Sequence, residues 1–186
     1  MKKLLALVIA GSALVACSSN KAPVEAPVAS APVVASAPVV AAAPAVSNHN
    51  SVYFAFNKYD VQDQYADLVK ANGSFLAANQ QAKVQVQGNT DDIGSVEYNL
   101  ALGQKRADAV KKALIATGAS KAQVEATSNG KLKAKYDNST DADRAQNRRA
   151  DIMFTANQPQ GYSADANGLP MVDGSVYNGT VTEGVQ

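Results

Sequence analysis

The stretch KVQVQGNTDDIGSVEYNLALGQKRADAV, residues 83–110, joins a strand pattern directly to a helix pattern. Its first residues alternate valine with glutamine, which predicts a strand with one buried face and one exposed face. Ser95 then stands where a helix N-cap belongs, and Leu102 and Val110 follow at helical spacing up to a stop at Gly118. A strand that leads straight into a long helix predicts a helix packed against a sheet.

Segments on both sides of this stretch continue the alternation of strands and helices. They are SVYFAF at residues 51–56, a helix from Asp60 to Leu76, QVEATSN at residues 123–129, a short helix at Asp141–Asn147 and RADIMF at residues 149–154. Gly103 and Ala107 would let the long helix approach the sheet closely, whereas Gly73 weakens the earlier helix. The order predicts an α+β fold over residues 50–155, a β/α sandwich with a mixed sheet of about four strands and its helices mainly on one face.

The N-terminal residues carry a processing signal. Two lysines precede an apolar run at residues 4–15, which is shorter than the ~20 residues that span a bilayer, so residues 1–16 are predicted to be a signal peptide. The LVAC that closes this run resembles the lipobox of bacterial lipoproteins, which implies lipid attachment at Cys17. Ser18 in the next position implies sorting to the periplasmic face of the outer membrane. A secreted protein with one unpaired cysteine is the alternative.

Low-complexity segments flank the predicted domain. Residues 17–49 repeat Ala-Pro with almost no charge, which predicts a lipidated, semi-rigid spacer of polyproline character. At ~3.1 Å per residue the spacer would reach roughly 100 Å when extended, and a docking peptide for a proline-binding partner is the alternative. Residues 156–186 are polar and rich in glycine, which predicts a disordered tail. Tyr162 and Tyr177 in this tail would otherwise mark a strip that binds a partner.

Composition argues against several classes of function. The 17 basic and 16 acidic residues nearly balance, so no basic excess indicates a nucleic-acid partner. The one cysteine allows no internal disulfide, and the one histidine, His49, falls in the predicted spacer. The predicted domain therefore has neither cysteine nor histidine, and no metal, cofactor or catalytic triad is predicted for it.

Charged residues gather in the connection after the second predicted strand. Asp91 lies on a glycine-flanked loop that leads into the helix, and Arg106 lies about three turns further on. Arg148 and Arg149 open the last predicted strand. A carboxylate near one or two guanidinium groups would form a polar cleft suited to a zwitterion, because the carboxylate takes an ammonium and an arginine fork grips a carboxylate. A structural salt bridge between an aspartate and an arginine is an equally open alternative.

The same stretches carry a resemblance to a known family. TDDIGSVEYNLALGQKRADAV, NRRADIMF and the YFAF strand resemble the peptidoglycan-binding domain shared by OmpA and the peptidoglycan-associated lipoproteins, and the resemblance covers residues 50–155. The lipobox and the Ala-Pro spacer resemble the lipoproteins more than OmpA, which carries a membrane barrel. The resemblance implies that Asp91 and Arg106 hold the ammonium and carboxylate ends of meso-diaminopimelate in a peptidoglycan stem peptide. The residues implied to shape this cleft are Phe56, Asn99, Leu102 and Arg148.

The chain departs from the family pattern in three places. Asn89 stands where the family commonly has histidine, and Asn57 stands where an aspartate often follows the strand. The long glycine-rich tail is not part of the usual pattern. Because asparagine still forms hydrogen bonds, we expect retained binding with an altered affinity or pH response.

The sequence is compatible with three alternative functions. The first is a non-catalytic tether between outer membrane and cell wall within the Tol–Pal system, in envelope integrity and cell division, where the cleft surface would also meet a Tol protein. The second is a wall-binding structural lipoprotein outside that system. The third is a wall-processing enzyme, which is disfavoured because the adjacent Asp91 and Asp92 are expected to point apart on their loop instead of forming a carboxylate pair.

Overall fold

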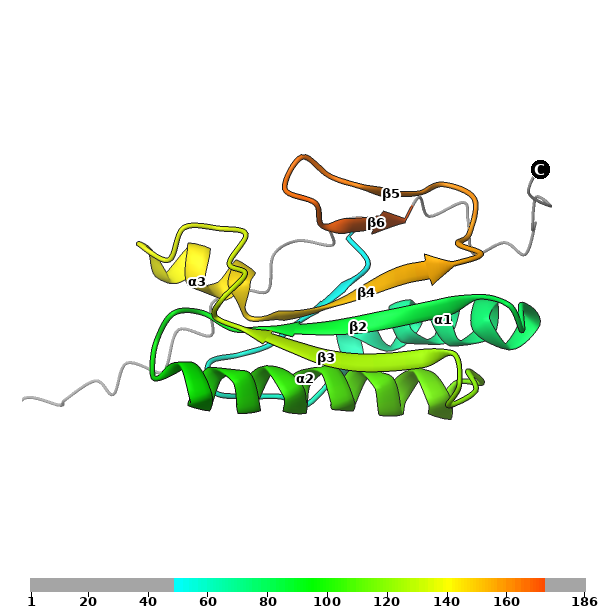
Figure 1. The fold of residues 1–186 in the computed structure, drawn as a ribbon, viewed down its shortest axis with the longest axis horizontal. Helices are drawn as coiled ribbons and strands as arrows, with labels where there is room; N and C mark the ends of the chain where they lie inside the picture. Colours follow the sequence, from blue (N-terminus) through cyan, green and yellow to red (C-terminus); the bar gives the residue numbers. More distant parts are fainter. Residues whose placement is uncertain (1–48, 173–186) are drawn as a thin grey trace, which may run out of the picture. The chain divides into compact units, whose positions relative to one another are not determined.

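The computed structural model describes residues 49–172 (Figure 1). The predicted signal peptide, Cys17, nearly all of the spacer and residues 173–186 lie outside the described residues, so those predictions stay predictions. In chain order the elements are β1 (Ser51–Tyr53), η1 (Asp63–Tyr65), α1 (Ala66–Ala78), β2 (Lys83–Asn89), α2 (Val96–Ala116), β3 (Val124–Gly130), α3 (Asp141–Asn147), β4 (Arg149–Ala156), β5 (Tyr162–Ala164) and β6 (Pro170–Val172).

Four strands form a mixed sheet in the order β1-β4-β2-β3 (Figure 1). β4 runs antiparallel to both of its neighbours, whereas β2 and β3 run parallel, as a strand–helix–strand connection through α2 requires. The antiparallel pairing brings the end of β2 beside the start of β4, with Gly88 opposite Ala150. The predicted α+β sandwich with a four-stranded mixed sheet is confirmed.

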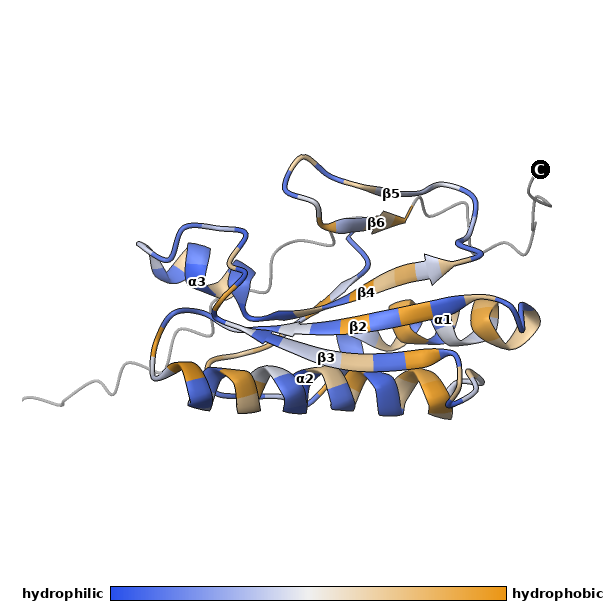
Figure 2. Cartoon of the chain, in the orientation of Figure 1, coloured by the Kyte–Doolittle hydropathy of each residue, from blue (hydrophilic) through white to orange (hydrophobic). Residues whose placement is uncertain are grey.

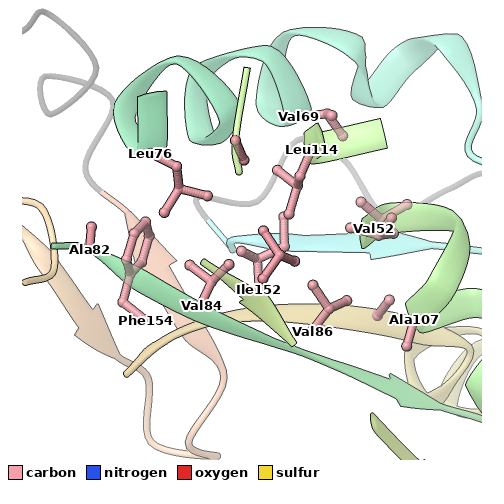
Figure 3. Packing of buried hydrophobic residues seen from close by; sticks show 14 of the residues in the cluster. Val52, Val69, Leu76, Ala82, Val84, Val86, Ala107, Leu114, Ile152 and Phe154 are labelled. Atoms are coloured by element: carbon pink, nitrogen blue, oxygen red, sulfur yellow. The ribbon is translucent and has the colours of Figure 1, made fainter. Parts of the chain in front are cut away.

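The core lies between this sheet and the helices α1 and α2. Val84, Val86 and Ile152 from the strands and Leu76 and Leu114 from the helices are all fully or almost fully buried (Figure 3). Each of the two helices contributes buried apolar residues to this core, and hydrophobic and hydrophilic residues alternate along α2 in Figure 2, as expected of a helix with one buried face. Both helices therefore cover the same face of the sheet.

Glycines set how closely these layers approach. A Cβ on Gly88 would lie only 1.8 Å from the Gly103 carbonyl oxygen, so α2 rests directly on β2 as predicted. Gly73 was expected to weaken α1, but it is the residue that allows α1 to approach α2. A Cβ there would lie 2.0 Å from the Thr117 hydroxyl oxygen.

The first half of the domain differs from the prediction between residues 54 and 65. β1 ends at Tyr53, and α1 begins at Ala66 after a short 3-10 turn, so the prediction of Asp60 as an N-cap is wrong. The reason is long-range: the intervening loop turns its Ala55 and Lys58 carbonyls toward Arg106, which binds both. Ser95, in contrast, is the predicted N-cap of α2, and its hydroxyl accepts from the Tyr98 amide at 3.1 Å.

The prediction of a disordered tail from residue 156 is wrong for the part that the structure describes. β4 continues to Ala156, and β5 and β6 form an antiparallel hairpin beside it (Figure 1). The hairpin folds because Leu169 is fully buried and the Tyr162 ring packs edge-on against Phe154, with ring centroids 5.2 Å apart. His49 also belongs to the fold and not to the spacer, because it pairs with Met171 in β6.

Candidate functional site

The loop after β2 is held so that its two aspartates point apart. Asp91 is buried and Asp92 is exposed, which confirms the expected divergence. The Thr90 amide donates to the Gly130 carbonyl at 3.0 Å. The Lys131 ammonium donates to the carbonyls of Asp92 and Gly94, at 3.0 and 2.6 Å. The loop is therefore fixed by residues of the β3 end, and the Asp91 carboxylate is directed into the protein.

Asp91 forms an ion pair with Arg148. Arg148 Nη1 lies 3.2 Å from Asp91 Oδ2, and Arg148 Nε donates to the Phe54 carbonyl at 3.3 Å. Both side chains are at least nine-tenths buried, which strengthens the interaction relative to a surface pair. Of the two alternatives open from the sequence, a structural Asp–Arg bridge is present, and its arginine is Arg148.

Arg106 lies beside this pair as a second buried cation. Its guanidinium donates to three backbone carbonyls, those of Asn89 at 2.8 Å, Lys58 at 2.9 Å and Ala55 at 3.3 Å. The guanidinium carbon also lies 5.2 Å from the centre of the Phe54 ring. Arg106 thereby joins the end of β2 to the loop that follows β1.

Burial lowers the pKa of Arg106 to about 10, with the Asp91 charge opposing the shift and the Arg148 charge adding to it. Arg106 stays protonated at neutral pH, because its pKa remains well above 7. Two cations thus lie near one carboxylate, and the cluster of Asp91, Arg106 and Arg148, which we call the charge cluster, has an excess of positive charge. That excess favours an anionic group such as a carboxylate.

The charge cluster is covered in the described state. Arg106 has no exposed surface, because residues 55–58 lie over its guanidinium. Asn57 in this segment has a left-handed φ of 56°, and the Tyr98 hydroxyl donates to its side-chain oxygen. A ligand that is to contact Arg106 therefore has to displace residues 55–58, which we call the covering loop.

The remaining predicted residues surround the cluster at different depths. Asn99 is fully buried at the start of α2, where its Nδ2 donates to the Ile93 and Ser95 carbonyls and its Oδ1 has no partner. Leu102, one turn further along α2, is almost buried. Phe56 lies on the covering loop with 58% of its surface exposed. The structure thus brings five of the six residues into or next to the cluster and leaves Phe56 at the rim.

Asn89, which departs from the family pattern, contributes its backbone carbonyl to the site. Its backbone carbonyl accepts from Arg106, but its side chain contacts the polar face of the sheet, with Nδ2 3.0 Å from Asp151 Oδ2. Asn129 in turn donates to Asn89 Oδ1 at 3.0 Å. The expected effect of Asn89 on affinity or pH response stays a prediction.

Sequence reasoning missed Lys131 and Tyr98, and it noted Asn57 as a departure from the family pattern without its structural role. Lys131 fixes the Asp91 loop from β3, and Asn57 and Tyr98 hold the covering loop to α2. Only Asn57 carried a local signal, since asparagine tolerates a left-handed conformation. The other two act through contacts between distant segments.

A family model described as "OmpA family" matches residues 53–148, which include the charge cluster and the covering loop. The chain belongs to the OmpA family. The match ends at Arg148, so the β5–β6 hairpin lies beyond the residues matched to the family model.

Similar proteins agree with this assignment. The chain is 43% identical over 106 residues to a peptidoglycan-associated lipoprotein of Pasteurella multocida (strain Pm70), across 57% of this chain and 71% of that protein. A protein of the same name from Haemophilus influenzae is 42% identical, across 57% and 69%. The crystal structure of the peptidoglycan-associated lipoprotein from Burkholderia pseudomallei is 50% identical with a TM-score of 0.56, across 56% of this chain and 89% of that chain. The family resemblance drawn from the sequence is confirmed.

Two further observations concern metal ligands and membrane-spanning helices. Within residues 49–172, no three side chains of His, Cys, Asp or Glu lie together in a way that could hold a metal ion. No helix in the same range combines the length and the apolar character needed to cross a bilayer.

Proposed function

We propose that this protein is an outer-membrane lipoprotein that binds peptidoglycan non-covalently and tethers the membrane to the cell wall. The ligand is the diaminopimelate of the stem peptide, a zwitterion that carries a carboxylate and an ammonium on the same carbon. The proposal is supported by membership of the OmpA family and by similarity to proteins named peptidoglycan-associated lipoprotein.

The charge cluster is the observation that carries the proposal. Its excess positive charge suits the ligand carboxylate at Arg106 and Arg148, whose guanidinium groups offer paired donors. Asp91 is the natural acceptor for the ligand ammonium, and the unpartnered Oδ1 of Asn99 offers a second acceptor nearby. Diaminopimelate satisfies both requirements with one amino-acid end.

Binding exchanges internal contacts for contacts with the ligand. The ligand carboxylate replaces the Ala55 and Lys58 carbonyls on Arg106, and the covering loop moves aside. Each charge-assisted hydrogen bond is worth roughly 1.5–3 kcal/mol, but the protein loses bonds of similar kind, so a micromolar-range affinity at best is expected for one stem peptide. The dense, repeated ligand of the wall then raises occupancy through local concentration.

Attachment to the membrane follows from the N-terminal sequence. Acyl chains on Cys17 would anchor the protein on the periplasmic face of the outer membrane, since several chains together hold stably where one does not. The Ala-Pro spacer, which ends before His49, would then let the domain reach the wall.

We extend the proposal to a role in the Tol–Pal system. Five large apolar residues are exposed on the segments around the charge cluster: Phe56, Tyr59, Ile93, Tyr98 and Leu132. Such a rim suits a protein partner, so a Tol protein would compete with the wall for one surface. A structural lipoprotein outside that system would need the charge cluster but not this rim. Catalysis is not proposed, because Asp91 is engaged by Arg148 and Asp92 points outward.

Sedimentation with purified sacculi tests the proposal. Asp91→Asn keeps the shape of the side chain and removes its charge, and we expect it to lose retention on sacculi. The matched control is Asp92→Asn, the same change on the exposed neighbour, which should sediment like the parent. Both variants must show the far-UV circular dichroism spectrum of the folded parent. Equal retention of the two variants would refute the assignment of the binding site to the charge cluster. Release of soluble wall fragments over time would favour an enzyme.

A further inference from the structure

The junction between the spacer and the domain is a point of mechanical weakness in the sheet. The chain reaches the sheet at His49 and Asn50 and continues into β1, an edge strand of only three residues that pairs with β4 alone. If the protein tethers membrane to wall, any tension arrives at this junction. A short edge strand held by its ladder alone would give way first.

Asn50 fastens the junction to three elements at once. It is fully buried; its amide donates to the carbonyl of Pro170 in β6 at 2.7 Å, and its carbonyl accepts from the Ile152 amide in β4 at 2.9 Å. Its side chain donates to the Ile152 carbonyl at 2.9 Å and exchanges two hydrogen bonds with the Asn72 amide group in α1, at 2.7 and 3.1 Å.

His49, the residue before Asn50, is itself bound to the hairpin. It forms an antiparallel bridge with Met171, and its Nε2 lies 3.2 Å from Asp165 Oδ2. Asp165 is itself fixed, because its other carboxylate oxygen accepts from the amides of Asn167 and Leu169, each at 2.8 Å. The Tyr53 hydroxyl lies 3.4 Å from His49 Nδ1, so the ring is held on both sides.

The hairpin is in turn attached to the sheet. The Phe154 amide in β4 donates to the Tyr162 hydroxyl at 3.1 Å, and Leu169 is fully buried. The hairpin also lies beyond the residues that match the OmpA family model. Its contacts with His49 and Asn50 give this additional segment a specific place in the fold.

The charge cluster lies at the opposite end of β1 from the junction. The Phe54 amide donates to the Arg148 carbonyl at 2.8 Å, directly after β1 ends, and Ala55 follows on Arg106. A pull between a bound wall ligand and the membrane anchor therefore runs along β1.

We propose that His49, Asn50 and the β5–β6 hairpin form a clip that holds the spacer junction, so that tension between anchor and wall passes into β4, α1 and the hairpin instead of peeling β1 away. This inference rests on the proposed tether function. Without the clip, the first event under load would be release of β1. The Phe54 amide, directly after β1, would then be pulled away from the Arg148 carbonyl, and the charge cluster would lose this support.

Single-molecule pulling on the full, unacylated chain tests the clip. Cys17, the only cysteine, provides one handle, and Asp92→Cys on the exposed loop beside the charge cluster provides the other. Asp165→Asn removes the carboxylate from His49 but keeps an oxygen for the hairpin turn, and we expect its unfolding rate at fixed force to rise by about threefold or more. Asn50→Ala should give a larger rise. The matched control is Asp60→Asn at an exposed position, which should unfold like the parent.

A second pulling axis separates the clip from general destabilisation. In a Cys17→Ser chain, handles at Asp92→Cys and Lys121→Cys load the α2 and β3 side and bypass the junction. The Asp165→Asn change should then alter the unfolding rate less than along the first axis. Equal rates for Asp165→Asn and parent along the first axis, or equal effects along both axes, would overturn the clip. Retention on sacculi is measured in parallel: failure of the parent to bind refutes the tether alone, whereas normal binding with unchanged pulling rates refutes the clip alone.

Discussion

Replacing Arg106 by lysine separates the charge of this residue from its shape. Lysine keeps the positive charge but has a single nitrogen, which cannot reach the Asn89, Lys58 and Ala55 carbonyls together. Loss of one or two charge-assisted bonds at roughly 1.5–3 kcal/mol each, partly offset by the bonds that lysine retains, predicts a fall of about 3 kcal/mol in the free energy of unfolding. We also expect loss of sacculus binding, because the covering loop and the cleft lose their common support.

Urea denaturation and sacculus sedimentation measure the two effects. Arg144→Lys is the matched control, since Arg144 forms an ion pair with the highly exposed Asp141, and its unfolding free energy should change by less than about 0.5 kcal/mol. If Arg106→Lys is as stable as Arg144→Lys and still binds sacculi, then charge alone suffices and the reasoning from the guanidinium geometry is refuted.

Two further predictions concern the anchor and the hairpin. Cys17→Ser should leave a soluble or unprocessed protein in fractionated cells, and retention of that variant in the outer membrane would contradict lipid attachment. Burial raises the pKa of Tyr162 above its ordinary value of 10.0, so the unfolded chain releases this proton first as the pH rises. The Tyr162 contribution to stability is thus fully present below about pH 10 and is lost as the pH rises through the higher folded pKa. Urea titrations between pH 8 and 11 should show a smaller loss in Tyr162→Phe than in the parent, and an equal loss would contradict the assignment.

Local signals in the sequence predicted those elements whose boundaries are set locally. The N-cap of α2 at Ser95 and the alternation of β2 depend on neighbouring residues, and both are confirmed. The loop before α1 was missed because Arg106 binds its carbonyls from a distant helix. The hairpin was missed because strands of three residues are too short to show a period, and its stability comes from burial of Leu169.

The sequence predicted which residues make up the candidate site, but not which arginine forms the ion pair with Asp91. The family resemblance named Asp91, Arg106 and Arg148, and the structure brings all three together. Which arginine would pair with Asp91 could not be read from spacing, because it depends on side-chain direction at the start of β4 and in the middle of α2. The burial of Arg106 under residues 55–58 was likewise outside the reach of sequence reasoning, since it follows from the path of a loop.

The contact between Gly88 and Gly103 has a consequence for how the site opens. Because not even a methyl group fits between strand and helix, β2 and α2 form the rigid part of the site, which carries Asp91, Asn99 and Arg106. Opening of the site then requires movement of the covering loop, residues 55–58. Changes of sequence in that short segment would adjust how readily the wall is gripped and released, and the charges that recognise it would stay in place.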